Sequence, residues 1–368
     1  MMRRTKVVTC CCVTLAWLVA ISCFAQNTIP KTYEKVKVAE GVYAFIAEEP
    51  KTEIVSGNSV AVIGDDGVLV VDTMHFPSLT RRMIADIKQL TDKPVRYVVN
   101  THWHPDHLMG NGEYKQAFPD VVILSTPSTR EQMESQVPTT YIRDTIAQIP
   151  AYVKILQEHL DTGKKKDGSP LRPVDLQHYQ DLIEESKFFL PELQQAKYTP
   201  PNQTFDQSIT VYLGKRQVNV MFLGRGNTAG DAVIYVPDAK TLMTGDLVVS
   251  PTPYAFGSFL TEWVETLKKL EALGATTIVP GHGDVQHDTS YIEELISLLQ
   301  STTSQVQQAF AQGLSLDDTR KKVDLSSFRR QMAGDSDKWN EVFHTAYEVP
   351  AVERAYREAK EGKLNDEN

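Results

Sequence analysis

The sequence is poor in cysteine, and its few cysteines are confined to one short segment. Only four occur in 368 residues, and they are Cys10, Cys11, Cys12 and Cys23. Cleavage after Ala25 would leave a mature chain with no cysteine, which excludes a disulfide framework even in an oxidising compartment. It also excludes a thiolate ligand from any metal site of the mature chain.

An excess of basic charge is also missing. The chain has 38 Lys and Arg against 47 Asp and Glu, a formal net charge of −9. It therefore lacks the positive footprint of proteins that bind nucleic acid. We find no repeat of fixed period and no low-complexity tract, and the length suffices for one large domain or two small ones.

Long hydrophobic runs are absent apart from Val7–Ile21, which is short for a membrane span. Three basic residues precede this run and Ala25 follows it, a pattern that predicts a secretory signal peptide over residues 1–25. We therefore expect a periplasmic or secreted protein without a membrane span. Lipid attachment at Cys23 is the alternative, but Ala20 fits the lipidation signal poorly, so we favour cleavage after Ala25.

Four potential metal ligands follow a predicted buried strand over residues 95–99. They are His102, His104, Asp106 and His107. Residues two apart in an extended segment point the same way, so the first two histidines can reach one point. Pro105 ends regular strand pairing, and the turn can direct the last two ligands to a second point. Imidazole and carboxylate groups are good ligands for zinc and similar divalent ions.

Strands and helices alternate over much of the chain, which favours an α/β layered fold. Predicted strands cover residues 42–46, 59–63, 68–71, 95–99, 121–124, 209–213, 218–223, 233–236 and 276–279, and predicted helices cover 77–90 and 261–273. Residues 129–198 instead carry two helical apolar stripes, which predict an inserted helical hairpin. Pro150 is expected to kink or split its first helix. The insert either covers hydrophobic surface or forms a lid or wall over the metal cleft.

The motif His-x-His-x-Asp-His after a hydrophobic strand resembles the first metal motif of the metallo-β-lactamase superfamily. Leu242–Asp246 is similar to the Thr-Gly-Asp motif of its glyoxalase-type members, and Val279–Gly283 is similar to its Pro-Gly-His-Gly motif. The resemblance implies a four-layer αββα sandwich over residues 26–287, with the helical insert at 129–198 and a helical extension at 288–368.

The resemblance also implies two metal sites that share the carboxylate of Asp246. The first set of ligands is His102, His104, Asn227 and Asp246, and the second is Asp106, His107, His282 and Asp246. Zinc, one or two ions per chain, is the expected metal, with iron and manganese as alternatives.

Asn227 is the main departure from the family pattern, because the superfamily usually has a histidine before Thr-x-Gly-Asp. An amide oxygen is a weaker ligand than an imidazole for zinc. Asn227 could coordinate weakly, hold a metal-bound water or hydrogen-bond the substrate. We therefore predict that the second site binds metal more tightly than the first.

Several other residues are expected near the metals. The resemblance implies that Asp72 supports the metal loop from behind, although it could equally be a turn residue at a strand end. Asp231 is expected to fix its own loop, and His75 to lie near the pocket without binding metal. Tyr254 and Phe256 are candidates for a substrate wall, or else pack beneath the helical insert.

The family resemblance implies a metal-dependent hydrolase with a small-molecule substrate, and the predicted signal peptide implies that it is secreted. A metal-bound hydroxide would attack an ester, thioester, lactone or lactam, and Asp106 would orient this nucleophile and move protons. One alternative is an iron enzyme that oxidises sulfur compounds, although those members usually rely on the histidine that Asn227 replaces. The other is a non-catalytic metal-binding member. A β-lactamase is not favoured because the insert would narrow the groove. The helical hairpin could support a homodimer.

Overall fold

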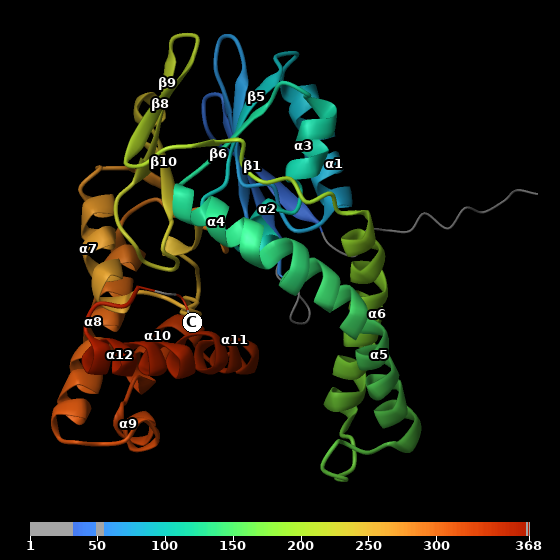
Figure 1. Ribbon diagram of the computed structural model, residues 1–368, viewed down its shortest axis with the longest axis vertical. Coiled ribbons are helices and arrows are strands. Elements are labelled where there is room, and N and C mark those ends of the chain that lie inside the picture. Colours follow the sequence, from blue (N-terminus) through green and yellow to red (C-terminus); the bar gives the residue numbers. More distant parts are fainter. Residues whose placement is uncertain (1–31, 49–54, 366, 368) are drawn as a thin grey trace, which may run out of the picture.

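The computed structural model describes residues 32–48, 55–365 and 367, so the predicted signal peptide lies outside the described residues. Its strands form two sheets (Figure 1). The first sheet has the order β1-β2-β3-β4-β5-β6-β7 and the second the order β12-β11-β10-β9-β8. The strands are β1 (Tyr33–Ala39), β2 (Val42–Ala47), β3 (Ser59–Ile63), β4 (Val68–Val71), β5 (Val95–Val99), β6 (Val122–Ser125), β7 (Gln203–Thr204), β8 (Ser208–Leu213), β9 (Arg216–Phe222), β10 (Ala232–Val236), β11 (Thr241–Met243) and β12 (Thr277–Val279).

Both sheets change from antiparallel to parallel pairing toward the strands that carry the metal motifs. In the first sheet β1 to β4 pair antiparallel, whereas β4, β5 and β6 pair parallel. In the second sheet β8 to β11 pair antiparallel, and β11 pairs parallel with β12. Neighbouring parallel strands end at the same edge, so the loops that follow them gather there.

Apolar side chains from both sheets meet in a shared core. Val60 and Val71 of the first sheet and Val220 and Ile234 of the second belong to one buried cluster. The apolar residues of these strands are buried on both faces, because helices cover the outer faces.

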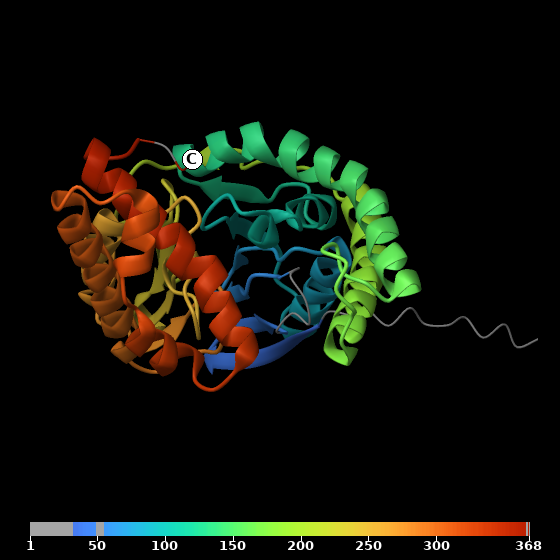
Figure 2. The same cartoon turned by 90° about the horizontal axis from the view of Figure 1, so that it is seen from below.

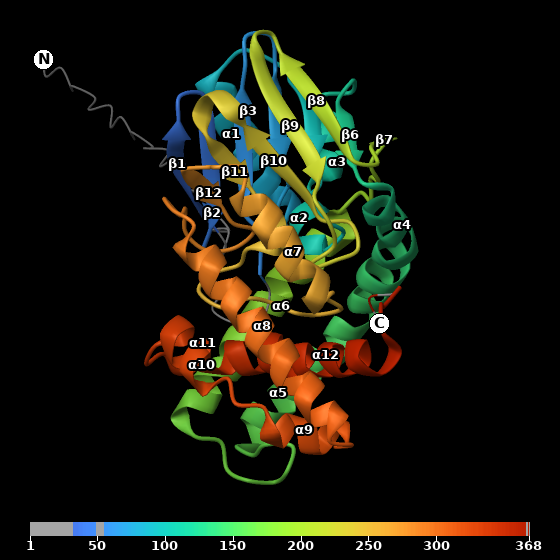
Figure 3. The same ribbon diagram turned by 90° about the vertical axis from the view of Figure 1, so that its left-hand side faces the viewer.

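The helices complete a four-layer αββα arrangement, which Figure 1 shows edge-on and which confirms the predicted fold class. Figure 3 looks onto the outer face of the second sheet, with α7 in front of its strands. The outer face of the first sheet packs on α1 (Pro77–Leu90) and α3 (Asn111–Ala117). The outer face of the second sheet packs on α7 (Leu260–Glu271) and α8 (Ser290–Ala311). Leu79, Met83 and Ile87 follow helical spacing along α1 and are buried against the sheet.

The helical insert consists of α4, a π-helix η1, and the hairpin of α5 and α6. Their bounds are α4 (Pro127–Gln136), η1 (Val137–Asp144), α5 (Thr145–Thr162) and α6 (Pro173–Gln195). Of the two alternatives predicted for Pro150, a kink or a split, the split is wrong, because α5 runs through this residue. The irregular backbone lies earlier, in η1. Figure 1 shows α5 and α6 side by side and extending beyond the sheets.

The C-terminal region is helical as well. It contains α9 (Leu316–Lys322), α10 (Ser326–Ala333), α11 (Asp337–Val342), the π-helix η4 (Phe343–Glu348) and α12 (Val349–Glu361). Helices α9 and α12 contact α8. Figure 2 shows the C-terminal helices and the α5–α6 hairpin on opposite sides of the molecule. Glu367 returns to the strand-end loops, where it accepts hydrogen bonds from Trp103 Nε1 (2.6 Å) and the backbone N–H of Ala229 (2.7 Å). In the described part of the chain, no helix combines the length and apolar character that a membrane crossing requires.

Candidate metal centre

The predicted metal ligands lie on loops that follow β5, β9, β11 and β12. After β5, Pro105 starts a single helical turn, α2 (Pro105–Leu108), which turns the chain after His104. Asp246 lies in the 3₁₀ turn η3 (Gly245–Leu247) directly after β11, and His282 follows β12. The remaining 3₁₀ turn, η2 (Pro237–Ala239), links β10 to β11 away from these ligands. The ligands therefore come from both sheets and meet at one edge of the sandwich.

These residues form two clusters, here called the first and second cluster. His102, His104 and Asp246 form the first, and Asp106, His107 and His282 form the second. Within each group, one potential ligand atom of each residue lies within 4.8 Å of the others. This spacing allows a single cation to contact all three residues of a group.

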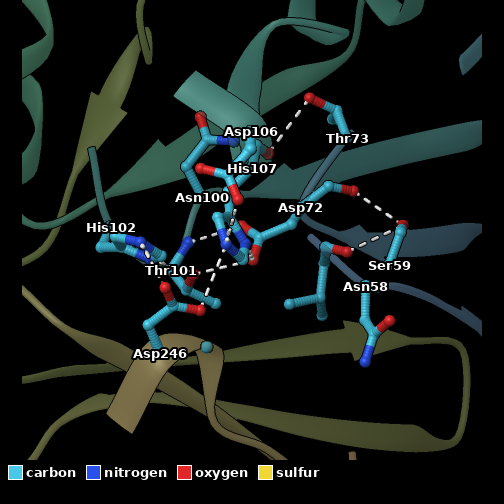
Figure 4. A network of polar contacts seen from close by, with 12 residues as sticks. Asn58, Ser59, Asp72, Thr73, Asn100, Thr101, His102, Asp106, His107 and Asp246 are labelled. Atoms are coloured by element: carbon cyan, nitrogen blue, oxygen red, sulfur yellow. Dashed lines mark hydrogen bonds and ion pairs between the residues drawn. The ribbon is translucent and has the colours of Figure 1, made fainter. Parts of the chain in front are cut away.

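The carboxylate of Asp246 lies between the two clusters (Figure 4). Its Oδ2 is 3.6 Å from His102 Nε2, while its Oδ1 is 3.2 Å from His107 Nε2 and 3.5 Å from His282 Nε2. One oxygen therefore faces each cluster, which is the arrangement of a carboxylate that bridges two cations.

Three buried polar atoms of this region have no hydrogen-bond partner among the described residues. They are His102 Nε2, Asn227 Oδ1 and Asp246 Oδ1. Burying such atoms unpaired is costly, and a cation would satisfy a lone pair on each of them. The residues present therefore fit divalent ions.

Asn227 is fully buried, and one hydrogen bond fixes its orientation. Its Nδ2 donates to the backbone carbonyl of Tyr254 at 3.0 Å. Because a carbonyl can only accept, the amide nitrogen must face Tyr254 and Oδ1 must face the other way. Asn227 therefore presents its unpaired oxygen as an acceptor, as a metal ligand or a partner of water would.

Asp72 sets the protonation of two imidazoles from behind the clusters (Figure 4). Its Oδ2 lies 2.9 Å from His107 Nδ1, which must therefore carry a proton and leave Nε2 as the ligand atom. Thr101 donates its hydroxyl proton to Asp72 (2.7 Å), so its oxygen accepts from His102 Nδ1 (2.9 Å). His102 Nε2 is thus also left unprotonated. Asp72 thus lies behind the ligand imidazoles, and its support of metal binding stays a prediction.

The local charge favours a cation. Burial lowers the pKa of His102, with His107 adding to the effect, and burial also lowers the pKa of His104. Burial alone would lower the pKa of His107, but the carboxylates of Asp106 and Asp246 outweigh it and hold that pKa well above its ordinary value. In the protein without metal, a proton on His107 therefore supplies the positive charge that a bound cation would otherwise bring.

At two positions only glycine fits, because the backbone passes close to the side chain of a predicted metal ligand. A Cβ added to Gly57 would lie 2.3 Å from the His107 ring, and one added to Gly281 would lie 2.0 Å from Asp246 Oδ1. Sequence reasoning placed Gly281 in its motif but missed Gly57. No local pattern marks Gly57, because its neighbour His107 is distant in sequence.

Asp231 does not reach the clusters but fixes the loop that carries Asn227. Its carboxylate accepts hydrogen bonds from the backbone N–H and the hydroxyl of Thr228. Burial raises its pKa to about 8 despite these bonds.

A cavity of about 760 Å³ opens beside His282. Tyr254 lines it, with its ring centroid 5.4 Å from that of His282, and Trp339 of α11 lines it from the C-terminal region. Phe256 is 53% exposed and is not among the described lining residues, so its role in substrate binding stays a prediction. Trp339 was missed in the sequence because it lies far from every metal motif.

Comparison with known proteins agrees with this geometry. The sequence model of one protein family, the metallo-beta-lactamase superfamily, matches residues 53–282. A linear primary-alkylsulfatase of Pseudomonas sp. (strain ATCC 19151) is 24% identical over 274 residues, which cover 71% of this chain and 48% of that protein. A metallo-beta-lactamase type 2 of Bacteroides fragilis is 27% identical over 108 residues, 26% of this chain and 43% of that protein. The chain thus spans about half the length of these curated relatives.

The solved structure of a metallo-beta-lactamase from Pontibacter korlensis superposes with a TM-score of 0.51 at 21% identity, covering 73% of this chain and 99% of that one. At this identity the likeness establishes the shared fold.

Proposed function

Because the chain belongs to the metallo-β-lactamase superfamily, we propose that the protein is a secreted metal-dependent hydrolase that cleaves an ester, thioester, lactone or lactam. The observation that carries this proposal is the position of Asp246, which turns one carboxylate oxygen toward each cluster. Two cations held on either side of a shared carboxylate are typical of metal-assisted hydrolysis.

The residues that would hold the metals follow from the two clusters. His102, His104 and Asn227 would hold one ion, Asp106, His107 and His282 the other, and Asp246 would contact both. Zinc suits this set of imidazole and oxygen donors, with iron and manganese as alternatives. An ion held there would lower the pKa of water and polarise the carbonyl of a substrate.

The chain's own residues provide orientation and proton transfer. Asp106 is 9% exposed, and its Oδ2 lies 3.1 Å from His282 Nε2. A carboxylate in this position can accept a hydrogen bond from an attacking water and fix its direction. Asp72, through His107 and Thr101, keeps the neighbouring imidazoles in the orientation that leaves their Nε2 atoms available.

The charges of the cavity lining favour an uncharged carbonyl substrate. Its described lining includes the exposed carboxylates of Glu34, Glu48 and Asp284 and no lysine or arginine. Three carboxylates at the entrance disfavour an anionic substrate, although solvent and salt screen this effect. Tyr254 and Trp339 offer aromatic surface to an apolar acyl or alcohol group.

Hydrolysis of an alkyl sulfate is the second candidate. It is favoured by the likeness to the linear primary-alkylsulfatase, which extends over 71% of this chain. The two candidates differ in the charge of the substrate, so one set of assays separates them.

The test is a substrate panel with the metal-replete protein. We expect hydrolysis of aryl esters, lactones or thioesters, with activity lost in Asp246→Ala and after chelation. Faster turnover of an alkyl sulfate would favour the second candidate. Failure to hydrolyse any member of the panel would overturn the proposed function, and oxygen uptake with a thiol compound would point to an oxidoreductase instead.

Secretion is tested separately by expressing the full chain in a bacterium and fractionating the cells. We expect a periplasmic or secreted product whose mass corresponds to cleavage after Ala25. A lipid-modified product beginning at Cys23 would replace that prediction, and an uncleaved cytoplasmic product would contradict it.

A further inference from the structure

The chain that follows α12 returns to the loops of the first cluster, where Glu367 uses both oxygens of its carboxylate. Oε2 accepts a hydrogen bond from Trp103 Nε1 at 2.6 Å, and Oε1 accepts one from the backbone N–H of Ala229 at 2.7 Å. The two donors belong to loops that are far apart in the sequence, one after β5 and one after β9. A single side chain therefore ties these two loops together.

These two loops carry the ligands that only the first cluster uses. Trp103 lies between His102 and His104 in the sequence, and its ring centroid is 4.8 Å from that of His104. Ala229 lies two residues after Asn227. The carboxylate therefore connects the segment that carries the two imidazoles with the segment that carries the amide.

A second anchor lies on the other side of Asn227. The carbonyl of Leu364, a buried residue, accepts a hydrogen bond from Arg225 Nη1 at 2.9 Å. Arg225 is itself fixed, because its Nε donates to Glu262 of α7 at 3.1 Å and its guanidinium carbon lies 3.9 Å from the ring centroid of Phe259. The chain after α12 thus holds the loop both before and after its ligand.

The same chain packs on the loop that orients the Asn227 amide. A Cβ added to Gly257 would lie 2.5 Å from the backbone oxygen of Glu367, so the two backbones are in close contact. Three residues before Gly257, the carbonyl of Tyr254 accepts the hydrogen bond of Asn227 Nδ2. Glu367 is therefore next to each of the three loops that place His102, His104 and Asn227.

The second cluster is held by other contacts. The backbone carbonyl of Asp106 accepts from the N–H of Gly57 at 3.0 Å. The backbone carbonyl of His107 accepts from the N–H of Thr73 at 2.7 Å. Both donors lie next to strands of the first sheet, Gly57 before β3 and Thr73 after β4. A change at Glu367 should therefore act on the first cluster and spare these contacts.

A rigid support matters most where a ligand is weak. An amide oxygen contributes less to the binding of a zinc-like ion than an imidazole does. If its loop also had to be ordered when the ion binds, the entropy cost would reduce the small gain further. A loop that is already held in the metal-free protein avoids this cost.

From these contacts we infer that Glu367 is a positioning residue for the first metal site, which it assembles by joining the loops of Trp103 and Ala229. The inference rests on the proposed function, because it needs the metal sites proposed there. It assigns a task to the chain after α12, which supplies no ligand but sets the distance between the imidazole pair and Asn227.

The test follows zinc binding at each cluster separately. Zinc is titrated into the metal-free protein against a competing chelator, and nitrogen-15 NMR of the histidine rings reports the binding. His104 reports the first cluster and His282 the second, each assigned by its own substitution by Gln. In Glu367→Gln the side chain keeps its shape, but it can accept only one of the two hydrogen bonds and turns an N–H toward the other donor. We expect zinc binding about tenfold weaker at the first site and changed by no more than about threefold at the second.

Glu361→Gln is the matched control. Glu361 is exposed at the end of α12 and pairs with Arg357 of the same helix, so the variant removes a carboxylate at a distance from the loops. It should change the zinc affinity of neither site.

The outcomes separate this inference from the proposed function. Equal weakening of both sites in Glu367→Gln would indicate general damage to the fold and overturn the inference, as would an unchanged first site. Zinc binding at His282 alone in the wild type would also overturn it, while leaving a hydrolase with one ion. A wild type that binds no zinc at either cluster would overturn the proposed function together with the inference.

A second measurement needs no metal. The indole N–H resonance of Trp103, assigned by Trp103→Phe, reports the hydrogen bond to Glu367 in the metal-free protein. It should shift in Glu367→Gln and stay in place in Glu361→Gln. A resonance that Glu367→Gln leaves unchanged would show that the two loops are not joined in this way.

Discussion

The two clusters share Asp246 but differ in the donors that complete them. The second cluster brings Asp106, His107 and His282, whereas the first brings His102 and His104, and Asn227 is the ligand proposed for its remaining position. An amide oxygen carries no charge and binds zinc-like ions more weakly than imidazole or carboxylate. The comparison predicts that two sites with similar geometry differ strongly in metal affinity because of one ligand position.

The hydrogen bonds that hold the ligand imidazoles also favour tighter metal binding by the second cluster. Asp72 contacts His107 of the second cluster directly, but it reaches His102 of the first only through the Thr101 hydroxyl. A carboxylate that accepts from a ligand imidazole increases its basicity, while a neutral hydroxyl does so less. Both differences predict that the second cluster binds its ion more tightly.

Replacing Asp72 by Asn should produce the largest effect on this comparison. Asn tolerates the left-handed backbone at this position (φ 54), so the change acts on the side chain alone. Its amide can no longer accept every proton that His107 and Thr101 donate to Asp72. We expect the second site to lose about 10- to 100-fold in affinity, as for other groups that support metal ligands. Competition with a chromophoric chelator measures this loss.

Thr101→Val is the matched control, because it removes only the relay to His102. It should weaken the first site and spare the second. Equal losses at both sites in Asp72→Asn, or none at either, would contradict the direct support of His107.

Asn227→His should reduce the difference in metal affinity between the two sites. It restores an imidazole to the first cluster, and we expect a gain of about tenfold in affinity there, or about 1.4 kcal/mol. Calorimetric titration of the metal-free wild type should show one tight and one weaker equivalent, and the variant should show two closer ones. Gln300→His, an exposed position on α8, controls for adventitious binding by an added histidine. Two equally tight equivalents in the wild type would show that Asn227 does not weaken its site.

The metal motifs at the strand ends were predictable because the residues of each motif lie within a few positions of one another in the sequence. A buried strand followed by closely spaced ligands is read directly from residues 95–107, and the structure gathers these ligands at one edge of the sandwich. The four layers followed from alternating strands and helices together with the family resemblance. Hydrophobic period and ligand spacing are short-range properties, so a single sequence carries them well.

Contacts between distant segments could not be predicted in the same way. Gly57 is needed only because the ring of His107 packs against it, and Trp339 reaches the cavity from the C-terminal helices. A split of the helix at Pro150 was likewise predicted as one alternative and is wrong, since proline indicates a disturbance of the helix but not where the backbone accommodates it. Such features depend on tertiary packing, which leaves no period in the sequence.

The smallest effect is expected at Asp231, which holds the loop that carries Asn227. Burial raises its pKa to about 8, so the folded protein keeps a proton that the unfolded chain loses above about pH 4. Stability from this group is therefore greatest below pH 4 and is lost as the pH rises toward 8. Asp231→Asn should make the free energy of unfolding fall less steeply with pH, by about 1 kcal/mol between pH 5 and pH 6. Urea unfolding of the metal-free proteins measures this slope, and parallel curves for wild type and variant would contradict it.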